Sequence, residues 1–86
     1  MVLPQPFGQT VTLGFGLAAG GDVELTVFSV DGRRVRTLVR GVREPGEYET
    51  VWDGRDDGGR AVRAGVYFAR LTAPQGRYAR TLTYLK

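Results

Sequence analysis

Residues 51–71 read VWDGRDDGGRAVRAGVYFARL, and this stretch decides how the rest of the chain is interpreted. An apolar strand ends at Trp52, a loop rich in Asp and Gly follows, and Gly65 begins a second apolar strand. Asp and Gly favour turns because Asp accepts hydrogen bonds from nearby backbone N–H groups and Gly adopts positive φ. The stretch therefore predicts two strands joined by an ordered loop, without the residues of a reaction centre.

The composition is that of a small globular domain of 86 residues, of which 42% are hydrophobic and 24% charged. A chain of this length forms one domain, residues 1–86, and buries about 60–65% of the surface that its unfolded form exposes. Cys and His are absent, which removes disulfides, thiolate ligands and the commonest general base. Since Ser29 is the only serine, we expect a non-catalytic domain with no cofactor and no metal site.

Short segments in which apolar residues alternate with a period of two, separated by Gly, Pro and Asp, are typical of all-β folds. We expect strands at 10–17, 22–30, 35–39, 47–53, 65–73 and 77–85, with a loop at 41–46. Two packed sheets bury both sets of apolar residues, so the sequence predicts a small antiparallel immunoglobulin- or fibronectin-like β-sandwich of about seven strands.

Two local signals refine this prediction. Asp31-Gly32 predicts a hairpin in which both central turn residues have positive φ. The apolar phase changes after Val27, which predicts either a β-bulge or a strand end covered on both sides.

The net charge is +3, and the arginines are densest around the predicted hairpin. Aromatic residues do not interleave this cluster and glutamates follow it, so nucleic acid is not an expected partner. A solvated strand face that discourages edge-to-edge pairing is favoured, with an acidic surface polysaccharide as an alternative partner. The cluster comprises Arg33, Arg34, Arg36, Arg40 and Arg43. No apolar run approaches the ~20 residues of a membrane span, so the chain is not expected to span a membrane.

The loop offers two further candidate sites. Asp53, Asp56 and Asp57 lie close together, as calcium ligands do, but the adjacent pair does not match the alternating spacing of a calcium loop. We favour a role in capping backbone N–H groups, with weak calcium binding as the alternative. Trp52 fits either a sugar-stacking platform or the sandwich core, and the alternation of its neighbours favours the core.

Several motifs occur in order along nearly the whole chain. They are Gln5-Pro6-Phe7, residues 13–17, residues 23–38, the block 52–59 followed by 65–68, and the terminal residues 81–86. Together these motifs resemble the immunoglobulin-like domain of the flagellar hook-cap protein FlgD and the related C-terminal sorting domains of the type IX (Por) secretion system. The block 52–59 followed by 65–68 is the most specific of them.

The resemblance implies a non-catalytic sorting or surface-attachment domain, residues 1–86, at the C-terminus of a longer secreted bacterial protein. Such a domain passes through the periplasm to the outer cell surface, and its expected partner is the secretion machinery or a cell-envelope component. The implied structural residues are Trp52, Asp53, Gly54, Asp56, Asp57 and Gly58. The implied recognition residues are Gly65, Tyr67, Arg80, Thr81, Leu82, Thr83, Tyr84, Leu85 and Lys86. The alternatives are a FlgD-like scaffolding domain and an accessory module that binds carbohydrate or stabilises an attached enzyme.

Overall fold

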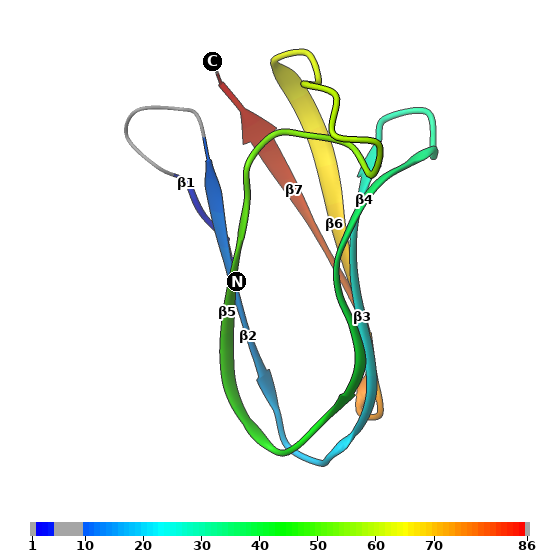
Figure 1. Ribbon diagram of the computed structural model, residues 1–86. Helices are drawn as coiled ribbons and strands as arrows, with labels where there is room; N and C mark the ends of the chain where they lie inside the picture. Colours follow the sequence, from blue (N-terminus) through cyan, green and yellow to red (C-terminus); the bar gives the residue numbers. More distant parts are fainter. Residues whose placement is uncertain (1, 5–9, 86) are drawn as a thin grey trace.

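The computed structural model describes residues 2–4 and 10–85, which form two antiparallel sheets facing each other (Figure 1). The strands are β1 (Val2–Pro4), β2 (Val11–Leu17), β3 (Gly21–Ser29), β4 (Arg34–Arg43), β5 (Gly46–Trp52), β6 (Gly65–Ala73) and β7 (Gly76–Tyr84). One sheet has the order β1-β2-β5 and the other the order β4-β3-β6-β7. The predicted β-sandwich is therefore confirmed. Gln5-Pro6-Phe7 and Lys86 lie outside the described residues.

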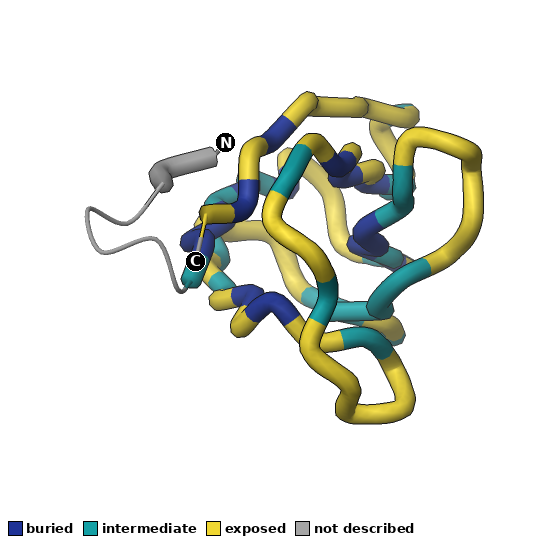
Figure 2. Tube along the Cα trace, turned by 90° about the horizontal axis from the view of Figure 1, so that it is seen from above, coloured by how far each residue is buried: buried dark blue, intermediate teal, exposed yellow. Residues whose placement is uncertain are grey.

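The core lies between the sheets and is built by the predicted alternation (Figure 2). Every second residue of β2 is buried, and these residues face the buried residues of β3, β6 and β7. Full burial of one large aliphatic side chain stabilises a fold by about 1.5–3 kcal/mol, so this inner layer supplies the main driving force. The buried apolar residues are Val11, Leu13, Phe15, Leu17, Val23, Leu25, Val27, Trp52, Tyr67, Ala69, Leu71, Leu82 and Tyr84.

The hairpin predicted at Asp31-Gly32 is present, but its expected geometry was wrong. Of the loop residues only Gly32 has positive φ, at 85°. The Gly32 N–H donates to the Ser29 carbonyl at 3.0 Å, and the Ser29 N–H donates to the Arg33 carbonyl at 2.9 Å. These bonds form a three-residue loop that ends in a left-handed glycine, a common alternative to the two-residue turn.

Strand β4 differs from the sequence prediction in its register with β3 and in where it ends. Register shifts between Leu25 and Thr26 and between Val27 and Phe28 leave the extra residues on β4. The bulge predicted within residues 22–30 was therefore placed on the wrong strand. The predicted loop at 41–46 was wrong, because Gly41 pairs with Val23 and the strand continues to Arg43. Pairing with β3 overrides the turn preference of Gly41. The short strand β1 was not predicted, since three residues give no periodic signal.

Two tyrosines anchor the loops that lead into their strands. The Tyr48 hydroxyl donates to the Glu44 carbonyl and the Tyr67 hydroxyl to the Arg63 carbonyl, each at 2.6 Å. Both contacts span four residues, as in the tyrosine corner of immunoglobulin-like sandwiches. Burial raises the pKa of the Tyr67 phenol above its ordinary value, with Arg63 opposing the shift and Tyr84 adding to it.

We predict that Tyr67→Phe lowers the free energy of unfolding by about 1 kcal/mol at pH 7, because the Arg63 carbonyl loses its donor. The wild-type protein should also lose stability as the pH rises through 10 and then through the raised pKa of Tyr67. The sign follows from proton binding: the unfolded chain ionises first, so the folded state holds more protons there, and this stability is fully present below pH 10.

Urea unfolding at pH 7 and at about pH 10.5 measures both effects. Tyr78→Phe is the matched control, since its hydroxyl makes only a 3.5 Å contact with the Gln75 carbonyl. An alkaline loss of stability as large in Tyr67→Phe as in the wild type contradicts the assignment.

Candidate functional site

Residues 53–64 connect β5 of one sheet to β6 of the other and cross one end of the sandwich (Figure 1). Trp52, the last residue of β5, is fully buried beneath this loop. Its indole Nε1–H donates to the Arg55 carbonyl at 2.9 Å, which fixes the loop to the ring. Trp52 thus lies in the core, as the alternation predicts, and it presents no ring face on which a sugar could stack.

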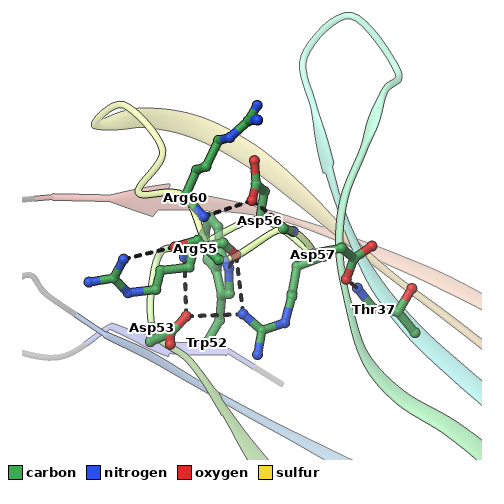
Figure 3. Close-up of polar contacts among 10 residues, drawn as sticks. Thr37, Trp52, Asp53, Arg55, Asp56, Asp57 and Arg60 are labelled. Carbon is green, nitrogen blue, oxygen red and sulfur yellow. Dashed lines mark hydrogen bonds and ion pairs between the residues drawn. The ribbon is translucent and has the colours of Figure 1, made fainter.

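Asp53 and Asp56 organise the loop through hydrogen bonds to its own backbone (Figure 3). Asp53 Oδ1 accepts the Arg55 N–H at 3.1 Å. Asp56 Oδ1 accepts two donors, the N–H groups of Gly58 and Arg60, both at 2.9 Å. Side-chain oxygens of Asp form such turns because they reach backbone donors two residues ahead. The loop is therefore a chain of capped turns.

Asp57 closes the exposed edge of β4. Its backbone N–H donates to the Val35 carbonyl at 2.8 Å, and its Oδ1 accepts the Thr37 N–H at 3.0 Å (Figure 3). One residue thus supplies the donor and the acceptor that a neighbouring strand would offer. Because an unpaired edge invites pairing with other chains, this contact protects β4 where its register is bulged.

Arg36 connects β4, at the edge of the four-stranded sheet, to the same loop. Its guanidinium lies 3.3 Å from Asp53 Oδ1 and 3.4 Å from the Arg55 carbonyl. The two charged side chains are 32% and 50% exposed, so the ion pair contributes at most about 1 kcal/mol. Its effect is to position the loop, and it removes one arginine from the basic cluster available to an acidic partner.

The three loop carboxylates are thus committed to backbone donors. Calcium takes about six to eight oxygen ligands, several of them from converging carboxylates. Within residues 2–4 and 10–85, no three His, Cys, Asp or Glu side chains converge on a metal-sized site. The loop side chains perform the capping that turn chemistry predicts.

Gly54 receives the end of the terminal strand. Its φ is +75°, and a Cβ built there would lie 2.1 Å from Cζ of Tyr84. The Tyr84 ring packs at a centroid distance of 5.2 Å from Trp52, which also contacts Tyr67 at 5.1 Å. The loop and the terminal strand are therefore one packing unit, and the sequence motif of Trp52 and Gly54 is a docking site for Tyr84.

The predicted recognition residues separate into two groups. Leu82, Tyr84 and Tyr67 are buried, so a partner can touch them only if the domain opens. The exposed members are Arg80, Thr81, Thr83 and Leu85, while Gly65 is half-buried and Lys86 lies outside the described residues.

An exposed apolar face on the four-stranded sheet was missed by sequence reasoning. Val66 and Phe68 of β6 point away from the core and are 46% and 37% exposed. In the register, Phe68 stands between Phe28 of β3 and Thr81 of β7, and Val66 pairs with Thr83. We call these five residues the outer apolar face. The signal that could have revealed it is the set of apolar residues out of phase with the core.

We predict that Gly54→Ala destabilises the domain by about 3 kcal/mol, combining the cost of left-handed φ with overpacking against Tyr84. Gly59→Ala is the matched control, because Gly59 has a φ of +84° and no neighbour within 4 Å of a built Cβ. It should cost only the backbone strain, about 1 kcal/mol. Urea unfolding compares the two variants, and equal losses would show that Tyr84 does not press on Gly54.

We predict that Asp57→Ala speeds hydrogen exchange of the Thr37 amide by about tenfold, the effect of losing a hydrogen bond worth about 1.4 kcal/mol. Asp57→Asn keeps the Oδ1 acceptor and should leave this rate nearly unchanged. Amide exchange followed by NMR decides between these outcomes. Unchanged protection in the Ala variant would mean that the loop does not seal β4.

A family model matches nearly the whole chain, and solved structures share its fold. The model of the FlgD Ig-like domain family matches residues 4–82. FlgD from P. aeruginosa has 25% sequence identity and a TM-score of 0.62, over 88% of this chain and 59% of that protein. FlgD from Xanthomonas campestris has 24% identity and the same TM-score, over 88% of this chain and 56% of that one.

A third solved structure shares the fold in a different setting. PorZ, described as an essential bacterial surface component of the type IX secretion system of Porphyromonas gingivalis, has 24% identity and a TM-score of 0.53. The match covers 99% of this chain and 11% of PorZ. The comparison with curated proteins found no match.

Two further facts bear on the assignment. The chain spans less than two thirds of the FlgD proteins that it matches. The described strands and loops include no helix long and apolar enough to cross a membrane. Because the family model covers almost the whole sandwich, including the loop and most of the terminal strand, the chain belongs to the FlgD Ig-like domain family.

Proposed function

We propose that this domain is a non-catalytic assembly module that positions other proteins in the manner of a FlgD-type hook-cap scaffold. The observation that carries the proposal is the family match over residues 4–82. The 25% identity to FlgD from P. aeruginosa supports it. We place the module outside the cytoplasm, in a secreted or surface-attached protein.

The chemistry of the loop supports a binding role over turnover. General acid–base catalysis needs a titratable group that is free to exchange a proton with a substrate. Asp53, Asp56 and Asp57 instead accept backbone N–H groups, and the chain contains neither His nor Cys. We therefore expect the domain to act by binding other proteins through its surface, and not by turnover of a substrate.

The outer apolar face is the contact surface that we assign to this role. Val66 and Phe68 expose apolar side chains on the four-stranded sheet, and Thr81 and Thr83 extend the patch onto the terminal strand. Exposed apolar patches rimmed by polar residues mark protein-binding sites. Two of the predicted recognition residues, Thr81 and Thr83, belong to it.

The test is a chimera in which this domain replaces the Ig-like domain of FlgD from P. aeruginosa. We predict that the chimera assembles hooks, counted by electron microscopy, and that Val66→Ser with Phe68→Ser reduces their number several-fold. Val51→Ser is the matched control, since Val51 is 53% exposed on the outer side of the other sheet. A stable, well-expressed chimera without hooks would overturn the scaffold proposal.

The second candidate is a sorting domain recognised by a secretion machinery. It is favoured by the exposed residues Arg80, Thr81 and Thr83 of β7 and by the exposed Leu85 that follows the strand. A deletion of residues 81–86 is a poor test, because it also removes the buried Leu82 and Tyr84. Thr81→Arg with Thr83→Arg keeps both core residues. Periplasmic retention of a fused cargo carrying this pair, in a type IX host that exports the wild-type fusion, supports sorting, and normal export contradicts it.

A further inference from the structure

Arg70 lies on the outer side of the four-stranded sheet, where no acidic side chain of the described residues pairs with it. Arg70 follows the exposed Phe68 by two residues on β6, so its side chain leaves the sheet on the same side, opposite to the buried Ala69 and Leu71. The ion pairs formed within residues 2–4 and 10–85 are Arg33 with Asp31, Arg36 with Asp53 and Arg40 with Glu24. The Arg70 guanidinium therefore remains available to an acidic group from outside the domain.

The ring of Phe28 orients this guanidinium. Cζ of Arg70 lies 4.5 Å from the centroid of the Phe28 ring, which is a cation–π contact. Such a contact uses the flat face of the guanidinium and leaves the N–H donors along its edge free. Two of these donors match the two oxygens of a carboxylate. Because Arg70 is already held in place on β6, less conformational entropy is lost when a carboxylate binds.

Arg34 adds a second positive charge on the other side of the ring. Arg34 of β4 is the Cα partner of Phe28, whose partner on β6 is Phe68. Side chains of directly opposed residues lie about 5 Å apart and those of diagonal neighbours about 7–8 Å, so Arg34 and Arg70 flank the same ring. Arg34 is exposed, and no carboxylate of the described residues forms an ion pair with it.

The acidic residues on the same side of the sheet do not neutralise these charges. Glu24 is paired with Arg40, whose Nε lies 3.9 Å from the Glu24 carboxylate. Asp22 lies near the opposite end of β3 from Phe28 and pairs there with Val42. The surface around the Phe28 ring thus carries a net positive charge.

Uncharged surface lies directly beside the two arginines. Val66 and Phe68 expose their side chains on β6 next to Arg70, and Thr81 pairs with Phe68 on β7. Arginine beside exposed aromatic side chains is the combination that most often dominates the affinity of protein interfaces. A partner that fits this surface therefore needs an acidic group and an apolar group close together.

We propose that the outer apolar face binds a partner protein through an acidic side chain, whose carboxylate accepts two N–H groups of Arg70 while a neighbouring apolar side chain covers Phe68. This inference rests on the proposed assembly function and adds the chemistry of the partner. Side chains two residues apart in an extended segment leave the same side about 6.5–7 Å apart, which is also the spacing of Phe68 and Arg70 along β6. The matching segment carries Glu or Asp and an apolar residue with one residue between them.

A second copy of the same face fits less well than an acidic partner. Pairing two copies face to face would bring Arg34 and Arg70 of one copy against the same arginines of the other, and like charges oppose such a contact. The net charge of +3 also favours an acidic partner at long range. Nucleic acids and acidic polysaccharides supply anionic groups but no aliphatic side chain to cover Val66, so we assign a protein.

The experiment titrates the 15N-labelled domain with the capped pentapeptide Leu-Gly-Glu-Gly-Leu and with its counterpart that has Lys in place of Glu. We expect the Arg70 Nε–H signal and the amides of residues 66–70 to shift, with affinity for the Glu peptide about tenfold higher than for the Lys peptide. Equal affinity for the two peptides, or no shift of the Arg70 Nε–H at millimolar peptide, overturns the proposal. Tighter binding of an oligonucleotide or a polyuronate than of the Glu peptide also overturns it.

Three variants separate the position of Arg70 from its charge. Arg70→Gln should lower affinity for the Glu peptide several-fold, and Arg70→Lys should also lower it, because lysine keeps the charge but lacks the planar fork. Arg43→Gln is the matched control, since Arg43 pairs with Gly21 at the far end of β4 and loses the same charge. Equal losses in Arg70→Gln and Arg43→Gln would show a general charge effect and overturn the proposal. If a variant fails to fold, the peptide charge swap on the wild-type domain still decides.

The FlgD chimera distinguishes failure of this inference from failure of the scaffold proposal. Hooks that decrease with Val66→Ser and Phe68→Ser but not with Arg70→Gln overturn the carboxylate contact and leave the scaffold proposal intact. A stable chimera without hooks, in a domain that still prefers the Glu peptide through Arg70, supports the carboxylate contact and overturns the scaffold proposal.

Discussion

The packing of Tyr84 against Gly54 and Trp52 is the constraint on which the rest of the structure depends. It joins the last strand of one sheet to the last residue of the other and fixes the start of the connecting loop. Aromatic pairs of this kind contribute about 0.5–1.5 kcal/mol beyond the burial of their surface. In a domain of 86 residues, whose total stability is modest, such a contact is a large fraction of the whole.

A consequence of this arrangement is that the side chains that stabilise the loop are not the ones that we propose for binding partners. The loop must hold positive φ at Gly54 and Gly59 and still satisfy its backbone donors, so Asp53 and Asp56 become caps. Because these carboxylates accept backbone N–H groups of the loop, their role is structural. The surface that we propose for partners lies elsewhere, on the outer side of β6 and β7.

Local signals in the sequence predicted most of the fold, and long-range pairing explains what they missed. The alternation in β2 and β6 located the core, and the Asp-Gly pair located the hairpin, because both depend on neighbours in the chain. Gly41 was misassigned because its pairing with Val23 is set by a distant strand. The burial of Leu82 and Tyr84, hidden in a motif attributed to recognition, follows from the docking of β7 on Gly54.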